Sequence, residues 1–141
     1  RDGGQTALAI AARIEQTEQA LLANGSDDAR AMARRLAAAR QAFVDVVQFV
    51  AANSKGSPNA AYAGSVPYLM LAGNLVAGWQ MGRAMLVALE QLAAGTDVAF
   101  MRAKCATARF YADHILTRAP GLREAVVEGA ASVGALALDA Y

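Results

Sequence analysis

Apolar residues recur along this chain every three or four positions, the spacing that places them on one face of an α-helix. The pattern predicts a first helix over residues 5–23, ended by Asn24-Gly25, and a second over residues 28–52. Ser26 or Asp27 is expected to cap the second helix. That helix has the cleanest seam, formed by Met32, Leu36, Ala39, Phe43, Val46 and Val50.

A third helix is predicted from about Ser65 to Ala94, with Pro67 tolerated in its first turn. Its apolar residues occupy two faces, so we expect it to be the most buried helix. Gly78 and Gly82 lie one turn apart and would allow another backbone to approach closely. The two faces comprise Leu71, Leu75, Gly78, Met85 and Leu89, and Leu69, Val76, Trp79 and Leu86.

The remaining pattern predicts a fourth helix capped by Thr96 or Asp97, interrupted at Ala119-Pro120-Gly121, and a final helix from Leu122. A polar loop at residues 53–59 separates two helical hairpins. Four long segments joined mostly by short loops predict an all-α fold, an up-and-down four-helix bundle with an additional C-terminal helix. We expect residues 1–141 to form a single helical-bundle domain.

The amino-acid composition supports the helical prediction and argues against some classes of binding partner. About a quarter of the residues are alanine, the best helix former. A formal net charge of +1 gives no electrostatic reason to expect nucleic acid or an anionic membrane as a partner. The lone cysteine, Cys105, excludes an internal disulfide and fits a reducing cytoplasm. We therefore expect a cytoplasmic protein.

The longest apolar run, residues 66–92, is a candidate for a membrane span. It contains Asn74, Gln80, Arg83 and Glu90, and its uninterrupted apolar pieces are shorter than the ~20 residues that a spanning helix needs. Polar groups in hydrocarbon are costly. A buried bundle helix is the better interpretation, and no membrane partner is expected.

Two residues could carry chemistry on their own. His114 is the only histidine and follows Asp113, but metal sites in bundles need Glu-x-x-His pairs on facing helices, and none occurs here. The pattern places every glutamate, Glu18 included, on a solvent-facing side. Cys105 lies on an apolar seam, whereas a reactive cysteine needs an electropositive, accessible setting. We expect both residues to be structural.

Aromatic and basic side chains offer two further candidate sites. Four aromatic residues could stack on an adenine or flavin ring, but aromatics at helical spacing usually serve as core or interface anchors. Four arginines of the second helix could meet a phosphate, but interleaved aspartates indicate a solvated face of mixed charge. The aromatic residues are Tyr68, Trp79, Phe110 and Tyr111, and the arginines are Arg30, Arg34, Arg35 and Arg40.

Two stretches carry a resemblance to a known family. Residues 66–74 (VPYLMLAGN), running on to Gly78-Trp79, and residues 106–116 (ATARFYADHIL) resemble the C-terminal helical domain of a branch of bacterial acyl-CoA dehydrogenases. That branch includes enzymes acting on methylthiopropanoyl-CoA-like and other acyl-CoA thioesters. The opening Arg1-Asp2-Gly3-Gly4 resembles the joint that follows the glutamate-bearing segment of such enzymes.

The resemblance implies a parent enzyme that introduces an α,β double bond into an acyl-CoA, with FAD as its cofactor. The catalytic carboxylate and the flavin site lie upstream of this domain in the family, so no catalytic, cofactor-binding or metal residue is assigned here. The expected partners are the upstream catalytic domains of the same chain and a second copy in a homodimer. The alternative is a free-standing bundle that binds a protein partner or a small apolar ligand.

Overall fold

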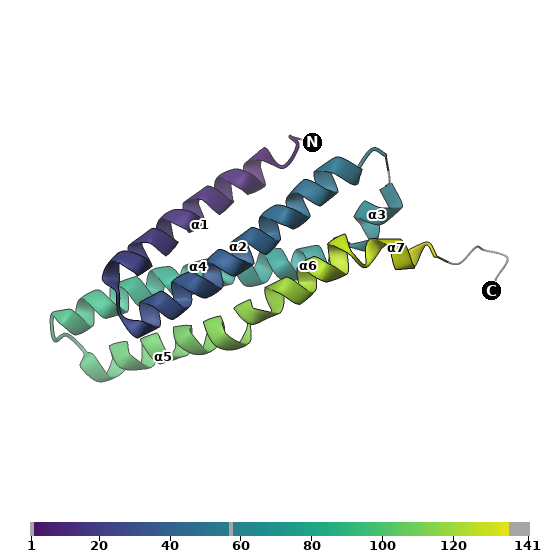
Figure 1. Cartoon of the computed structure of the whole chain (residues 1–141). Helices are drawn as coiled ribbons and strands as arrows, with labels where there is room; N and C mark the ends of the chain where they lie inside the picture. Colours follow the sequence, from purple (N-terminus) through teal and green to yellow (C-terminus); the bar gives the residue numbers. More distant parts are fainter. Residues whose placement is uncertain (1, 57, 136–141) are drawn as a thin grey trace.

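The computed structural model of the chain describes residues 2–56 and 58–135, and this part is built from helices and turns (Figure 1). The all-α prediction is confirmed. The helices are α1 (Gln5–Asn24), α2 (Asp27–Asn53), α3 (Pro58–Ala63), α4 (Ser65–Ala93), α5 (Val98–His114), α6 (Ala119–Val127) and α7 (Ala130–Val133), with a 3₁₀ turn at Leu116–Arg118.

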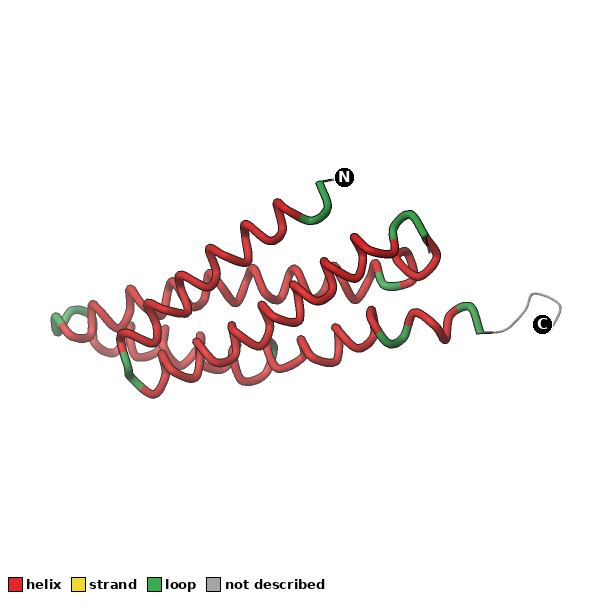
Figure 2. Tube along the Cα trace, turned by 45° about the horizontal axis from the view of Figure 1, so that its top comes forward, coloured by secondary structure: helices red, strands yellow, loops and turns green. Residues whose placement is uncertain are grey.

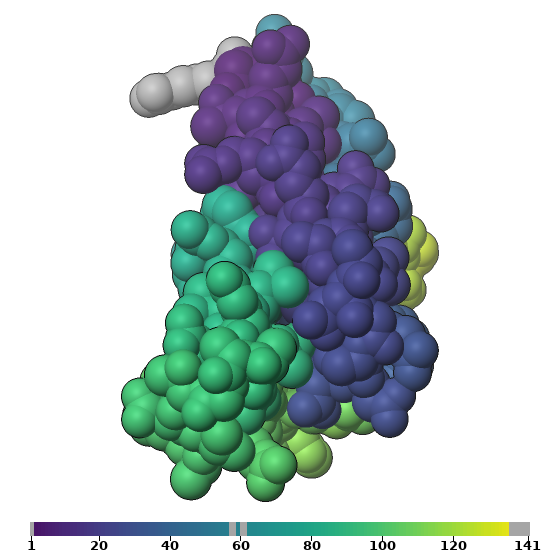
Figure 3. Space-filling model, turned by 90° about the vertical axis from the view of Figure 1, so that its left-hand side faces the viewer, coloured from purple at the N-terminus to yellow at the C-terminus, as the bar shows by residue number. Residues whose placement is uncertain are grey.

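The long helices form an elongated bundle. α1 and α2 make an antiparallel hairpin, α4 runs back along it, and α5 and α6 follow one another as the fourth rod (Figures 1 and 2). α2 and α4 each contact α1, α5 and α6 as well as one another, so these two are the central helices. Seen from the end that carries the α1–α2 turn, α1 (purple) lies beside α4 (teal) (Figure 3).

The turn between α1 and α2 follows its predicted signals. Gly25 adopts a left-handed conformation with φ 76°, and its N–H donates to the Leu21 carbonyl. The Ser26 hydroxyl accepts a hydrogen bond from the Ala29 N–H at 3.3 Å, which makes Ser26 the cap. Asp27 and Asp28 occupy the first turn of α2, where negative charge suits the helix dipole.

The predicted interruption of the fourth rod is misplaced. α5 already ends at His114, and the 3₁₀ turn at Leu116–Arg118 leads into α6, which begins at Ala119. Pro120 lies in the first turn of α6, where its missing N–H would have had no helical partner. The proline therefore starts a helix, and α6 continues the fourth rod instead of forming a separate helix from Leu122.

Two smaller expectations are also corrected. The polar loop predicted at residues 53–59 is shorter, because the chain turns into α3 at Pro58. Asp97 precedes the first residue of α5, as expected of a cap, but it makes no side-chain hydrogen bond to the helix. It adopts a left-handed conformation with φ 45° instead, so it turns the chain without capping the helix.

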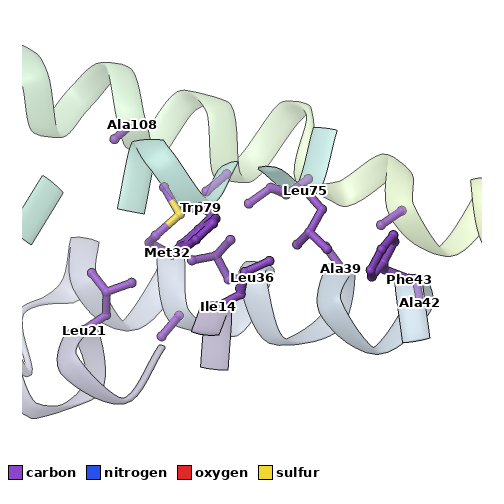
Figure 4. Packing of buried hydrophobic residues seen from close by; sticks show 14 of the residues in the cluster. Ile14, Leu21, Met32, Leu36, Ala39, Ala42, Phe43, Leu75, Trp79 and Ala108 are labelled. Carbon is purple, nitrogen blue, oxygen red and sulfur yellow. The ribbon is translucent and has the colours of Figure 1, made fainter. Parts of the chain in front are cut away.

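The core lies along α2, with α1, α4 and α5 around it, and Figure 4 shows its side chains converging. α2 contributes ten buried residues and α4 seven, so the prediction that α4 is the most buried helix is wrong. Part of its second apolar face is exposed, at Leu69 and Val76, although Trp79 of the same face is buried. The largest fully buried side chains include Ile14, Leu21, Met32, Leu36, Leu71, Leu75 and Met85.

Among the helices of residues 2–56 and 58–135, none is both long and apolar enough to cross a membrane.

Candidate functional site

A buried carboxylate on α1 corrects the prediction that every glutamate faces solvent. Glu18 is 3 % exposed and forms an ion pair with Arg40 of α2, with 2.6 Å between Nε and Oε2. A second, longer contact of 3.5 Å joins Arg40 to Glu15. The hydrogen bonds that Arg40 donates to the Glu18 carboxylate raise the pKa of its guanidinium. Arg40 is therefore held by carboxylates and is not available to a phosphate.

The other arginines of α2 do not gather into one site. Arg30 pairs with Asp27 on the same helix, and Arg35 Nε lies 3.6 Å from Asp113 of α5. Arg34 is exposed. The arginines thus point to different neighbours, which agrees with the predicted face of mixed charge.

Cys105 and His114 both lie on α5, in different surroundings. Cys105 is 4 % exposed, and its burial, with a smaller effect from the charge of Asp28, raises the pKa of the thiol. The prediction of a buried thiol is confirmed. His114 is exposed and stacks on Phe110, with ring centroids 4.3 Å apart. Within the described part of the chain, no group of three or more His, Cys, Asp or Glu side chains is placed to hold a metal ion.

Three of the four aromatic candidates serve packing. The Trp79 Nε1–H donates to Thr17 Oγ1 at 2.9 Å, which fastens α4 to α1. The Tyr111 hydroxyl donates to the Asn74 carbonyl at 2.8 Å, which fastens α5 to α4. Burial raises the pKa of that hydroxyl. Tyr68 lies against Phe43 of α2, with ring centroids 6.1 Å apart. The fourth, Phe110, is 61 % exposed and is not a core anchor.

The glycine pair of α4 admits side chains and not a second backbone. A Cβ at Gly78 would stand 2.6 Å from Leu116 Cδ2, and one at Gly82 would stand 3.0 Å from Leu36 Cδ1. Leucine side chains from the fourth rod and from α2 therefore fill the space that the glycines leave. The predicted close approach of another backbone is corrected to a close approach of these two side chains.

An apolar groove of about 760 Å³ lies where the beginning of α1, the end of α2 and the beginning of α4 meet. Its walls include Ile10, Phe43, Val47, Val50, Tyr68 and Leu75. Polar side chains occur among its lining residues at the chain entry and at the end of α2, namely Asp2, Thr6, Ser54 and Lys55. An apolar cavity of this size can accept aliphatic or aromatic groups.

A second apolar surface, the α4 outer face, lies beside this groove. It consists of Val66, Leu69, Met70, Val76 and Val87, which are 65 %, 67 %, 49 %, 42 % and 56 % exposed. The first charged residue of α4 is Arg83, so no charge interrupts the face between Val66 and Val76. Gln80 and Arg83 lie between this stretch and Val87 along the helix. Exposed apolar surface of this kind is typical of protein–protein interfaces.

The groove has no signal in the sequence because it depends on how three helices diverge. The α4 outer face does have a signal in the sequence, namely the second set of apolar residues on this helix. These residues were predicted to be buried, but part of this face is exposed. Both features belong to α4 and to the helices next to it. They make this side of the bundle the candidate interaction site.

Comparison with known proteins identifies the family of the chain. The family described as acetyl-CoA dehydrogenase C-terminal like matches residues 10–137. A curated relative, the 3-methylmercaptopropionyl-CoA dehydrogenase of Ruegeria pomeroyi, is 47 % identical over 116 residues, which is 82 % of this chain and 20 % of that protein. The chain thus spans about a fifth of the length of the relative. No solved structure matches. The chain belongs to the family of acetyl-CoA dehydrogenase C-terminal-like domains.

Proposed function

We propose that this chain is the non-catalytic C-terminal structural and assembly domain of an FAD-dependent acyl-CoA dehydrogenase. The family match over residues 10–137 carries the proposal. The name of the relative, a 3-methylmercaptopropionyl-CoA dehydrogenase, suggests an acyl-CoA thioester as the substrate class of the parent enzyme. In this proposal, residues 1–141 are one domain of a larger cytoplasmic enzyme.

The proposal places the flavin outside this chain. Bound FAD would supply the hydride acceptor for α,β-dehydrogenation of the acyl-CoA. Two of the described arginines that could otherwise meet its diphosphate are held by carboxylates. Arg40 is paired with Glu18, and Arg109 is paired with Asp28 and Asp113. We therefore assign no chemical step to this chain.

The role that remains is assembly, and the α4 outer face supports it. A face that exposes Leu69 at 67 % and Val66 at 65 % is costly to leave in water. We propose that it packs on the catalytic body of the parent enzyme or on a second copy of this chain in a homodimer. A two-fold pair that uses the same face on both chains is the simplest closed arrangement.

The assembly role is tested in the parent enzyme by deleting residues 1–141. We expect the deleted enzyme to keep its flavin and to lose thermal stability or its oligomeric state, measured by melting and light scattering. An enzyme whose flavin content, melting and mass are all unchanged by the deletion would contradict an assembly role.

Self-association is tested in the 141-residue chain. Light scattering should report a dimer at micromolar concentration, and Leu69→Lys should give a folded monomer. Val133→Lys tests the exposed end of α7 in the same way, since Val133 is 66 % exposed. Gln48→Lys, at an exposed polar position on α2 instead of α4, is the control and should leave the dimer intact. A wild-type chain that stays monomeric would contradict the homodimer.

A further inference from the structure

The polypeptide enters the bundle through residues that also line the apolar groove. Asp2, Gly3 and Gly4 border the groove just ahead of α1. The Asp2 carboxylate accepts hydrogen bonds from the Gly4 N–H at 2.9 Å, the Thr6 N–H at 3.2 Å and the Thr6 hydroxyl at 2.6 Å. These bonds satisfy N–H groups at the start of α1 and fix the entry as an ordered turn.

The turn bends the chain away from the axis of α1. Gly3 and Gly4 have φ values of 68° and 85°, which side-chain-bearing residues rarely adopt. Figure 1 shows the resulting hook at the start of α1. A Cβ at Gly4 would stand 2.5 Å from Val47 Cγ1, so the turn formed by Asp2, Gly3 and Gly4 lies directly against the groove wall. The described chain therefore leaves the axis of α1 at Gly4 and lies beside the groove as far as Asp2.

The chemistry of the groove suits apolar side chains attached to a peptide. Phe43 and Tyr68 lie tilted against one another on one side, and Val47 and Val50 of α2 add aliphatic surface. Lys55 and Ser54 stand near the end of α2, where they can meet the polar backbone of an occupant. An apolar interior with polar groups at the edge is the usual anatomy of a peptide-binding groove.

We propose that in the parent enzyme this groove holds apolar side chains of the segment that directly precedes Asp2, folded back onto α1, α2 and α4. This inference rests on the proposed function, because it requires a longer chain ahead of the domain. The family is named for a C-terminal position, and the chain covers 20 % of its relative. The other domains of such an enzyme would therefore precede Asp2 in the polypeptide. A covalently joined segment acts at an effective concentration of about millimolar, far above that of a free partner.

The test compares the rate of cysteine labelling at the groove in the 141-residue chain and in the full-length parent enzyme. Ala51→Cys places a thiol on the α2 wall, where Ala51 is exposed and lies off the α4 outer face. Ala103→Cys, at an exposed alanine of α5, is the matched control. Both variants carry Cys105→Ala. The thiols are labelled with N-ethylmaleimide, and peptide mass spectrometry measures the rate of modification at position 51 or position 103.

We expect labelling of the Ala51→Cys variant to be slower by about tenfold or more in the parent enzyme, with the control unchanged, because an occupied groove excludes the reagent. Equal rates at position 51 would overturn the proposal. In a third protein, a Gly-Ser linker of equal length replaces the 15 residues or so ahead of Asp2. Protection should then be lost, and protection that persists would mean that another part of the enzyme occupies the groove, which also overturns the proposal.

Flavin absorption and acyl-CoA oxidation of the same full-length protein separate the two claims. A flavin-containing, active enzyme with an unprotected position 51 would contradict only the groove assignment. A parent protein without flavin or activity would contradict the proposed function, whatever the labelling at position 51.

Discussion

Glu18 of α1 and Arg40 of α2 form a two-point ion pair that joins the first hairpin. Arg40 Nε donates to Oε2 at 2.6 Å, and Nη2 donates to Oε1 at 3.1 Å. The Glu18 side chain is 4 % exposed and that of Arg40 is 19 % exposed. A buried pair with this geometry specifies how two helices align, because sliding one helix leaves both charges without a partner.

Removing the carboxylate should therefore be costly. We expect Glu18→Ala to lower the free energy of unfolding by about 2–4 kcal/mol, because it leaves a largely buried guanidinium with a weaker partner. Urea unfolding measures the change. Glu15→Ala removes the longer contact of a side chain that is 53 % exposed and should cost less than about 1 kcal/mol. Equal effects of the two substitutions would contradict the assigned role of Glu18.

Acid sensitivity should depend on Asp45, which joins α2 to α6. Hydrogen bonds from Gln41 and then from Arg123 hold the pKa of this carboxyl below its ordinary value of 3.8. Because the pKa is lowered by folding, the stabilisation is present above about pH 4 and is lost as the pH falls through the pKa of the folded state.

Between about pH 4 and pH 2, we expect the Asp45→Asn variant to lose less free energy of unfolding than the wild-type chain does. Urea unfolding at each pH measures the difference. Gln41→Ala removes the first of the two hydrogen bonds and should move the acid-induced loss to higher pH without abolishing it. A pH profile that Asp45→Asn leaves unchanged would show that the carboxyl titrates alike in the folded and unfolded chain.

Two glycines of α4 should respond to alanine in opposite directions. Gly73 faces open space, so Gly73→Ala should stabilise the helix by about 0.5–1 kcal/mol. Gly78→Ala places its Cβ against the Leu116 side chain and should destabilise by about 1–2 kcal/mol. Thermal unfolding of the two variants measures both signs. If Gly73→Ala and Gly78→Ala both stabilised the protein, the Leu116 side chain would have to move without cost, which would contradict the prediction.

Cys105 should be inert in the folded protein. A thiol reagent should react with it far more slowly in the native state than in denaturant, because the side chain is 4 % exposed and its pKa is raised by burial. Cys105→Asp should cost about 3–5 kcal/mol, since it buries a carboxylate without a partner. His114→Ala, at an exposed ring, should change stability by less than about 1 kcal/mol. Equal labelling rates in the native and unfolded states would contradict the buried position.

The long helices could be predicted from the sequence because local signals agree there. The seam of α2, the Ser26 cap and the left-handed Gly25 each specify a boundary without reference to the rest of the fold. The predicted end of α5 is misplaced because the break precedes Pro120, and proline is as suitable for starting a helix as for ending one.

The features of the candidate site depend on tertiary arrangement. The burial of Glu18 follows from the register of α1 against α2, which brings Arg40 opposite it, 22 residues further along the chain. The groove follows from the way α1, α2 and α4 diverge at one end of the bundle. Neither arrangement has a local pattern, so residue spacing alone could not predict it.

The central claim is that this chain is a non-catalytic domain of an acyl-CoA dehydrogenase. The most direct test records the absorption spectrum and acyl-CoA-dependent dye reduction of two purified proteins, the 141-residue chain and the full-length parent enzyme. We predict that the parent enzyme is yellow and active, and that the 141-residue chain is colourless and inactive. A chain of 141 residues that carries flavin or oxidises an acyl-CoA, or a parent protein that does neither, would contradict the claim.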